Sequence, residues 1–190
     1  MKQTKKNKIR IISGEFRGQK IFIKKTYKVR PTTDRMRETL FNWIHARTIN
    51  ANCLDCFSGS GALGIEALSR YASFVTFIEK HKRTAYELKK TIIKFKKQNI
   101  KIINADATKW LNKIRKPYDI IFLDPPFNTE LLQNTIIQLD KYKYTKMYSL
   151  IYIEQARTSK KLFIPYYWTL YKEKKTLNVH YQLYICQKNN

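Results

Sequence analysis

From residue 52 onward, the sequence alternates between short apolar runs and longer stretches with helical spacing. The helical patterns cover residues 62–70, 82–97 and 130–139. The apolar runs, each short enough for one buried strand, lie at 53–57, 74–78, 100–103, 120–123 and 149–153. Such alternation predicts an α/β fold with a mostly parallel sheet and helices on both faces. Because these sheets bind ligands beyond the carboxyl ends of their strands, residues at strand ends are the first candidates for a site.

Both ends of the chain carry hairpin signals. Near the N-terminus, the strand-like runs 9–12 and 19–23 flank Gly14 and Gly18, which predicts a small β-hairpin. Toward the C-terminus, the runs 167–171 and 179–186 are joined by the polar stretch 172–175 and predict an antiparallel hairpin that completes a seven-stranded sheet. We expect one domain over residues 1–190, with a basic hairpin extension at 1–30 and a core at 31–190.

The net charge narrows the class of partner. The chain has 38 Lys and Arg residues against 14 Asp and Glu residues, a formal charge of +24. A surface this basic attracts polyanions, and nucleic acid is the leading candidate. The alternative is compositional drift toward Lys, Ile, Asn and Tyr without selection for binding, and charge alone does not separate RNA from DNA. No apolar window is long enough to span a bilayer, and no apolar signal region follows the basic N-terminus, so we expect a cytoplasmic protein.

Three cysteines are too few for a disulfide framework. The spacing of Cys53 and Cys56 allows a metal or redox interpretation. The pair falls in a predicted strand with no second pair nearby, so the sequence favours two thiols in the core and no metal site.

A glycine-rich loop follows the first strand of the alternating region. Gly59 and Gly61 let the backbone turn tightly and approach a ligand. With Gly64 and with Glu79 after the next strand, the loop matches a dinucleotide fingerprint, which is weak by itself. Asp55 argues against that interpretation, because its charge would oppose a pyrophosphate and would favour a ligand with an ammonium group.

Asp55, Glu79 and Asp106 each follow a predicted strand. S-adenosylmethionine has an ammonium, a ribose diol and an adenine amine, and three acids at strand ends match these three groups. The alternatives are that Asp55 and Asp106 cap helices and that Glu79 is a solvated charge beside Lys80 and Lys82. The predicted cofactor-binding residues are Asp55, Gly59, Ser60, Gly61, Glu79, Asp106 and Ala107.

The motif Asp124-Pro125-Pro126-Phe127 ends a buried apolar run. An exocyclic amine on a base is a poor nucleophile, because its lone pair is delocalised into the ring. Hydrogen bonds to Asp124 and to the carbonyl of Pro125 can pyramidalise the nitrogen and direct its lone pair, while the prolines stiffen the loop and Phe127 stacks on the base. The alternative is a simple turn. We predict that these four residues are catalytic, and a paired base would first have to turn out of its helix.

Four segments, residues 10–14, 30–43, 54–70 and 124–127, resemble in order the bacterial 16S rRNA guanine-N2 methyltransferases of the RsmD type. The 30–43 segment is the most specific of them, since many amino-methyltransferases share the glycine loop and the Asp-Pro-Pro-Phe motif. Cys56 and Ser58 are mild departures.

The resemblance implies a Rossmann-like class I S-adenosylmethionine-dependent methyltransferase. It implies methylation of N2 of one guanine in 16S rRNA, within the small ribosomal subunit or its assembly intermediate, and we expect a monomer. Three alternatives remain: a DNA amino-methyltransferase, a non-catalytic RNA-binding protein, and an NAD-dependent oxidoreductase.

Substrate recognition must come from the basic hairpin, the helix after residue 30 and the loops around Phe127, because no length remains for a separate RNA-reading module. The candidate substrate-binding residues are Arg10, Arg30, Arg35 and Arg37. We expect Arg35 or Arg37 to contact the cofactor carboxylate or an RNA phosphate. The alternative is a capped, solvated helix face.

Overall fold

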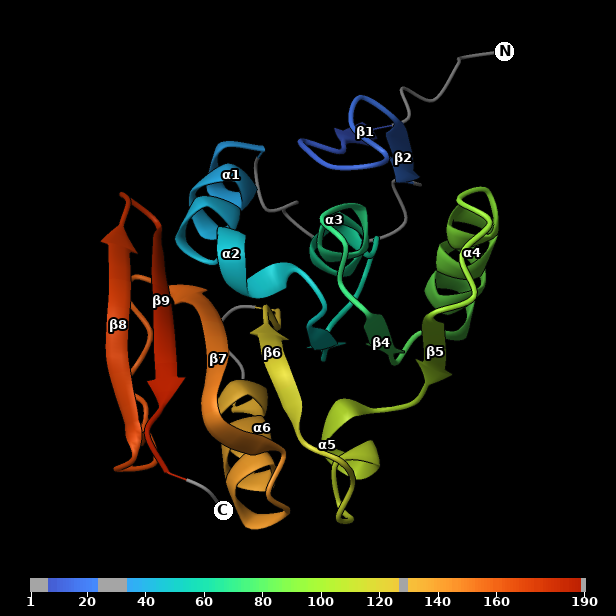
Figure 1. The fold of residues 1–190 in the computed structure, drawn as a ribbon. Helices are drawn as coiled ribbons and strands as arrows, with labels where there is room; N and C mark the ends of the chain where they lie inside the picture. Colours follow the sequence, from blue (N-terminus) through green and yellow to red (C-terminus); the bar gives the residue numbers. More distant parts are fainter. Residues whose placement is uncertain (1–6, 24–33, 127–129, 189–190) are drawn as a thin grey trace.

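The computed structural model describes residues 7–23, 34–126 and 130–188 (Figure 1). Its strands are β1 (Asn7–Arg10), β2 (Lys20–Ile23), β3 (Asn52–Asp55), β4 (Phe74–Glu79), β5 (Ile100–Asn104), β6 (Tyr118–Leu123), β7 (Thr145–Ala156), β8 (Trp168–Lys175) and β9 (Val179–Cys186). Its helices are α1 (Asp34–Trp43), α2 (His45–Thr48), α3 (Ala62–Ser69), α4 (Lys82–Ile93), α5 (Ala107–Trp110) and α6 (Leu131–Lys141).

Seven strands form one sheet in the order β5-β4-β3-β6-β7-β9-β8. The pairs from β5 to β7 are parallel, whereas β9 pairs antiparallel with both β7 and β8. The strand order reverses direction between β3 and β6, which is where an open sheet leaves a crevice for ligands. The predicted fold class, including the small N-terminal β1–β2 hairpin and the C-terminal antiparallel hairpin, is confirmed.

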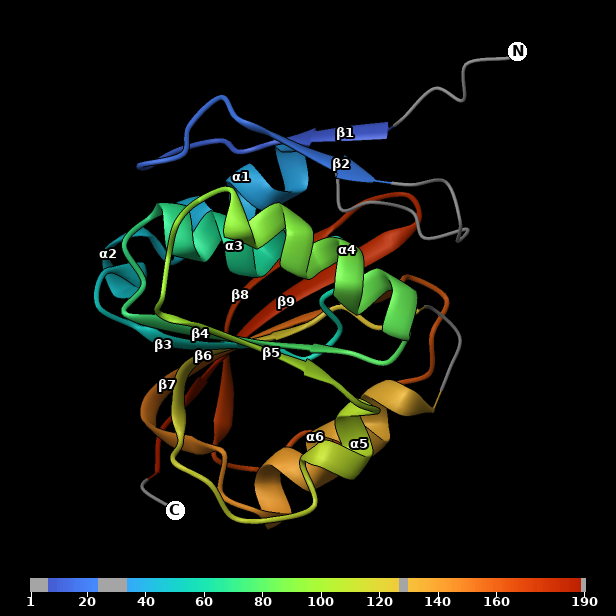
Figure 2. The ribbon, with the colours of Figure 1, turned by 90° about the vertical axis from the view of Figure 1, so that its right-hand side faces the viewer.

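Helices cover both faces of the sheet (Figure 2). One face packs against α1, α3 and α4, and its core includes Leu40, Ile65 and Leu88. The other face packs against α5 and α6, with Leu111 and Ile136 in a second cluster. Apolar side chains therefore hold the strands between two helical layers and fix the strand ends that form the site.

The β1–β2 hairpin lies over α3 (Figure 2). Ile9, Ile11 and Ile21 from this segment are part of the same apolar core as α3. Gly14 has φ +82°, and a Cβ atom there would lie 1.8 Å from the carbonyl oxygen of Ser69. Only glycine allows the loop to approach the end of α3 this closely.

Several boundaries differ from the predictions. Residues 172–175, predicted as the connection within the C-terminal hairpin, belong to β8 and pair with β9. They are polar because β8 is an edge strand with most of its side chains in solvent. Helix α4 ends at Ile93 rather than at residue 97, and the short helices α2 and α5 were not predicted, since four residues carry little periodic signal.

The prediction that Cys53 and Cys56 are thiols in the core is confirmed. Cys53, Cys56 and Cys186 are buried free thiols, and burial raises the pKa of both Cys53 and Cys56. Among the described residues, no group of three or more His, Cys, Asp or Glu side chains could hold a metal ion. Within that same part of the chain, no helix is long and apolar enough to cross a membrane.

Candidate active site

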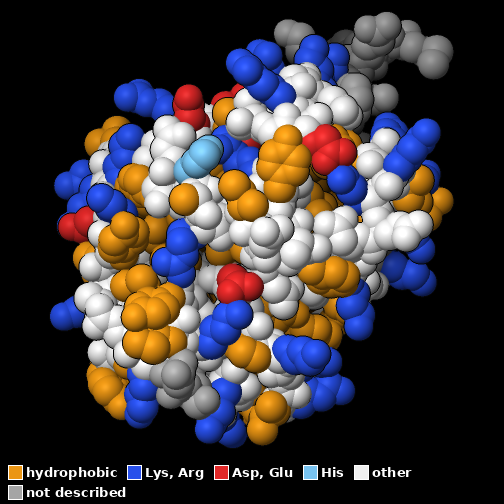
Figure 3. Space-filling view, in the orientation of Figure 1, with side chains coloured by type: hydrophobic (Ala, Val, Ile, Leu, Met, Phe, Trp, Pro, Cys, Tyr) orange, Lys and Arg blue, Asp and Glu red, His pale blue; other side chains and the backbone are white. Residues whose placement is uncertain are grey.

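A cavity of about 590 Å³ opens at the carboxyl ends of β3 to β7, a volume typical of small-molecule sites. Five of the chain's 14 acidic residues line it, one from the end of each of these five strands or from the segment just after it. They are Asp55, Glu79, Asp106, Asp124 and Glu154. This gathering contrasts with the face of the molecule in Figure 3, where Lys and Arg side chains outnumber acids. The cavity therefore favours a ligand with cationic or hydrogen-bond-donating groups.

The glycine loop forms one wall of the cavity, through Ser58, Gly59 and Ser60. Gly61 stands just outside this lining as the residue that turns the loop into α3, with φ +78°. A Cβ atom there would lie 2.4 Å from Cδ1 of Leu88, so both the backbone angle and the packing require glycine. The structure thus places the predicted residues Gly59 and Ser60 at the cavity. Gly61 does not line the cavity and instead allows the turn from the loop into α3.

Asp55 ends β3 and is 3% exposed. Its Oδ2 accepts a hydrogen bond of 3.2 Å from the backbone N–H of Gly64, in the first turn of α3. Burial, together with the nearby charges of Asp124 and Glu79, raises the pKa of Asp55 to about 7, although backbone N–H groups of Gly64 and Phe57 oppose the shift. The N-cap of α3 is Gly61 rather than Asp55, so the capping alternative is wrong for this residue, although Asp55 accepts a hydrogen bond from the first turn of the helix. A cationic ligand would stabilise the charged form of Asp55.

Glu79 ends β4 and is buried, so it is not a solvated charge. Its Oε2 accepts from the N–H of Gly59 at 2.9 Å, and its Oε1 accepts from the N–H of His81 at 2.7 Å. The carboxylate thereby ties the glycine loop to the end of β4. Two carboxylate oxygens offer about four acceptor positions, so sites remain for ligand hydroxyls.

Asp106 is the N-cap of α5, as the alternative reading held. Its Oδ1 accepts from the N–H of Thr108 at 3.1 Å and from the Thr108 hydroxyl at 2.6 Å, while Oδ2 lies 2.9 Å from Nζ of Lys80. The hydrogen bond from Thr108, followed by Lys80, lowers the pKa of Asp106 to about 2. Asp106 and the buried Ala107 both line the cavity, so capping and ligand contact are compatible.

Asp124 follows β6 directly and is half-buried at the cavity wall, beside Pro125 and Pro126. Pro125 is buried and Pro126 is exposed, so the loop reaches from the core to the surface. Phe127, the fourth predicted catalytic residue, lies outside the described residues. The structure thus places Asp124, Pro125, Pro126 and the glycine loop on one cavity.

Glu154 was not predicted, and it lines the cavity near the end of β7. Leu123 pairs with Ile153, so Asp124 and Glu154 come next on neighbouring parallel strands. The Tyr152 hydroxyl donates to Oε2 of Glu154 at 3.2 Å, and burial followed by the charges of Glu154 and Asp124 raises the pKa of Tyr152. The apolar run at 149–153 held the signal, because Glu154 follows it as the other acids follow theirs.

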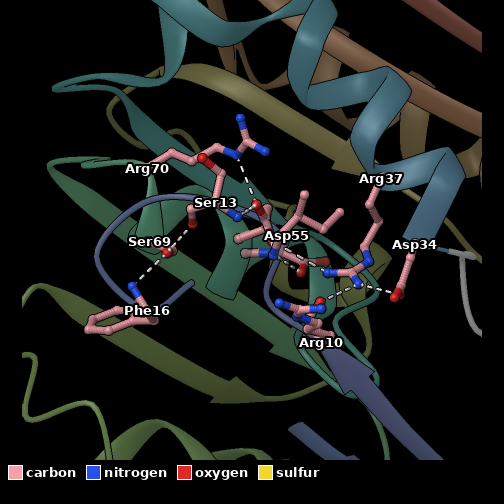
Figure 4. Close-up of polar contacts among 11 residues, drawn as sticks. Arg10, Ser13, Phe16, Asp34, Arg37, Asp55, Ser69 and Arg70 are labelled. Atoms are coloured by element: carbon pink, nitrogen blue, oxygen red, sulfur yellow. Dashed lines mark hydrogen bonds and ion pairs between the residues drawn. The ribbon is translucent and has the colours of Figure 1, made fainter. Parts of the chain in front are cut away.

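Arg37 lies in a buried network rather than on a solvated helix face (Figure 4). Its guanidinium donates to Oδ1 of Asp34 at 2.7 Å and to the carbonyl of Arg10 at 2.6 Å, and it lies 3.5 Å from Oε2 of Glu66. Glu66 also accepts from Nε of Arg70 at 2.8 Å. Arg37 has no exposed surface and joins α1, α3 and the β1–β2 hairpin. Its guanidinium is therefore not accessible to an RNA phosphate.

The other candidate arginines are placed differently. The Arg10 and Arg35 side chains are exposed, so both are accessible to a large ligand, and neither lines the acidic cavity. Arg30 lies outside the described residues. The structure therefore separates the predicted substrate-binding arginines from the predicted cofactor-binding acids.

Residues 9–185 match a family model described as conserved hypothetical protein 95. A protein of Buchnera aphidicola named ribosomal RNA small subunit methyltransferase D is 52% identical over 99% of this chain and 97% of its own length. The Escherichia coli protein of the same name is 43% identical over 93% of this chain and 89% of its own length. A solved structure of a proposed methyltransferase from Escherichia coli is 41% identical, covers 96% of this chain and 100% of its own, and superposes with a TM-score of 0.90.

Proposed function

The chain belongs to the family described as conserved hypothetical protein 95, and from this premise we propose that it transfers a methyl group from S-adenosylmethionine to N2 of one guanine in 16S rRNA. The names of its relatives support methylation of small-subunit ribosomal RNA. The observation that carries the finer proposal is the single cavity that joins the glycine loop and its acids to the Asp124–Pro126 loop.

The residues present fit S-adenosylmethionine. We propose that Asp55 faces its cationic amino-acid end, that Glu79 accepts from its ribose hydroxyls and that Asp106 accepts from its adenine amine. Gly59, Ser60 and Ala107 would contribute backbone and small side-chain contacts along the same wall. The raised pKa of Asp55 supports the first assignment, because a buried carboxylate without a matching charge gains most from a cation.

Asp124 and the carbonyl of Pro125 would accept hydrogen bonds from the N2 amine of guanine. These two acceptors orient the nitrogen lone pair, and the rigid Pro125-Pro126 backbone holds them in place. Bound S-adenosylmethionine supplies an electrophilic methyl group. A bond forms between N2 and that carbon as the carbon–sulfur bond breaks, and N2 then releases a proton to water or to Asp124.

Glu154 supports guanine over adenine as the base. Guanine presents two donors on one edge, N1–H and the N2 amine, whereas adenine has an acceptor at N1. A second carboxylate beside Asp124 can accept from N1–H of guanine, and it would repel the N1 lone pair of adenine. Asp124 directly after β6 and Glu154 in β7 are neighbours at the cavity, so they could each accept from one of the two guanine donors.

The substrate that we propose is 16S rRNA within the small ribosomal subunit or its assembly intermediate. A monomer of residues 1–190 would act as one domain, because hairpin residues share a core with α3 and α4. Recognition by shape suits an RNA already organised by other molecules.

The test is transfer of labelled methyl from S-adenosylmethionine to unmodified small subunits, naked 16S rRNA and duplex DNA, followed by identification of the methylated nucleoside. We expect label in the small subunit, in N2-methylguanosine. Label in DNA alone would favour the DNA amino-methyltransferase. Cofactor binding without transfer to any substrate, or no binding at all, would refute the proposal.

A further inference from the structure

A second hollow, which we call the groove, has a volume of about 370 Å³ and lies between α1 and the β8–β9 hairpin. Arg35, Thr39 and Trp43 line it from α1, and Lys174 lines it from β8. No acidic residue is among the described residues that line it. This composition is the reverse of the acidic cavity, although both hollows are on the same protein.

The two hollows adjoin. Met36 of α1 and Val179 of β9 line both of them, so the two hollows lie on either side of these two side chains. Tyr152 connects them as well, because its ring lines the groove while its hydroxyl donates to Glu154 in the cavity. The groove is therefore adjacent to the cavity.

Cationic and aromatic groups are arranged along the groove. Nζ of Lys174 lies 3.4 Å from Oγ1 of Thr39, which holds the ammonium near α1 at the side of the groove. The rings of Tyr152 and Tyr181 are nearly parallel, at 7° with centroids 6.4 Å apart, and both are buried in the groove floor. Trp43 is half-buried at the wall. The Arg35 and Lys174 cations suit a phosphate, and the partly exposed ring of Trp43 suits a base.

We propose that this groove binds the nucleotide next to the target guanine on the same RNA strand, with its phosphate at Arg35 and Lys174. The inference rests on the proposed function. A base turned into the cavity leaves its neighbours at the rim, where enzymes of this kind commonly contact the flanking nucleotides. The acid-free groove accepts the polyanionic backbone, and the acidic cavity accepts only the base, so the charge pattern orients the strand.

The test measures binding of a short fluorescent single-stranded RNA with one guanosine among uridines, over a series of salt concentrations. We compare wild type with Lys174→Gln and Arg35→Gln, and with Lys172→Gln as the control, because Lys172 is an exposed cation on the same strand outside the groove. Each groove variant should weaken binding roughly fivefold and reduce the slope of log affinity against log salt by about 1. Lys172→Gln should change neither quantity by as much.

In transfer assays, the groove variants should raise KM for RNA while leaving kcat and affinity for S-adenosylmethionine near wild type. Lys174→Gln and Arg35→Gln that bind RNA as Lys172→Gln does, with the same salt slope, would overturn the inference. So would loss of binding to an acidic peptide probe with RNA binding unchanged, since the groove would then fit a protein partner. The RNA-binding readout does not depend on turnover, so absence of transfer would count against the proposed function and not against the groove.

Discussion

Glu66 in α3 and Asp55 at the end of β3 are both buried carboxylates, but their surroundings differ. Glu66 accepts from the backbone N–H groups of Ile12 and Ser13 at 2.8 and 3.0 Å, and it pairs with two guanidinium groups. Asp55 accepts from backbone N–H groups and has the acids Asp124 and Glu79 as its charged neighbours. Burial of a charge costs free energy, and only Glu66 has cations to offset it.

The difference separates a carboxylate that cations of the fold neutralise from carboxylates that we propose face a cationic ligand. The contacts of Glu66 anchor the β1–β2 hairpin and α1 to α3. The five acids of the cavity gather at one opening, on a chain with a formal charge of +24, and Asp55, Glu79 and Asp106 also accept hydrogen bonds from nearby backbone. Substitutions in the two groups should therefore fail in different assays.

Glu66→Ala should have the largest effect, and on stability. It leaves the buried Arg37 with Asp34 as its remaining carboxylate partner, removes the partner of Arg70, and leaves two backbone N–H groups of the hairpin loop without their acceptor. We expect a loss of about 3–5 kcal/mol in the free energy of unfolding, measured by urea denaturation. Glu38→Ala, at an exposed position of α1, is the control and should cost less than about 0.5 kcal/mol. Equal effects of the two substitutions would remove the distinction between the regions.

Asp124→Asn should come next, and in catalysis. Loss of the charged acceptor for the N2 amine should lower the rate of transfer by roughly 10²–10³-fold, about 2.7–4 kcal/mol of transition-state stabilisation. Urea denaturation and S-adenosylmethionine affinity should stay near wild type. A variant that transfers at the wild-type rate, or that loses cofactor binding first, would show that Asp124 has been assigned the wrong role.

Asp55→Asn should change the pH dependence of stability. Because the pKa of Asp55 is raised from 3.8 to about 7, the folded state holds a proton across that range that the unfolded state has lost. The unfolding free energy of the ligand-free protein should therefore fall as pH rises from about 4 to 7, as far as this group contributes. Denaturation at several pH values should show a smaller fall in Asp55→Asn. An identical pH profile would place the titration elsewhere.

Asp106→Ala should have the smallest effect on stability, because an N-cap contributes about 1 kcal/mol. Its lowered pKa gives the opposite sign to Asp55, so this contribution is present above pH 4 and is lost as pH falls toward 2. Asp106→Asn retains the cap and should restore most of the stability, while a weaker affinity for S-adenosylmethionine persists. Full restoration of that affinity by Asn would limit Asp106 to capping.

Much of the fold was predictable from the sequence, because strands and helices each leave a periodic pattern of apolar residues. The acids could then be placed at the ends of the predicted strands. The family resemblance based on four motifs is confirmed by relatives that match nearly the whole chain. Glu154 was missed although it follows an apolar run, since no motif marked it. Arg37 was a candidate contact for the cofactor carboxylate or an RNA phosphate, because a sequence does not show that Glu66, far along the chain, lies beside it in the core.

The groove beside the cavity was also beyond prediction. Arg35 and Lys174 are far apart in sequence, and they line the same groove only because the C-terminal hairpin lies beside α1. Polar residues 172–175 were assigned to a turn, and their place on an edge strand depends on the pairing with β9. Long-range packing, rather than local pattern, brings these cations together.

The most direct test of the account is a titration of S-adenosylmethionine into wild type and Asp55→Asn at pH 8, with unfolding of each ligand-free protein measured in parallel. We predict saturable binding to wild type and an affinity at least roughly tenfold weaker in Asp55→Asn, about 1.4 kcal/mol. The ligand-free variant should be no less stable than wild type. Wild-type affinity in Asp55→Asn, or a loss of stability like that of Glu66→Ala, would contradict the assignment of the cavity acids to a cationic ligand.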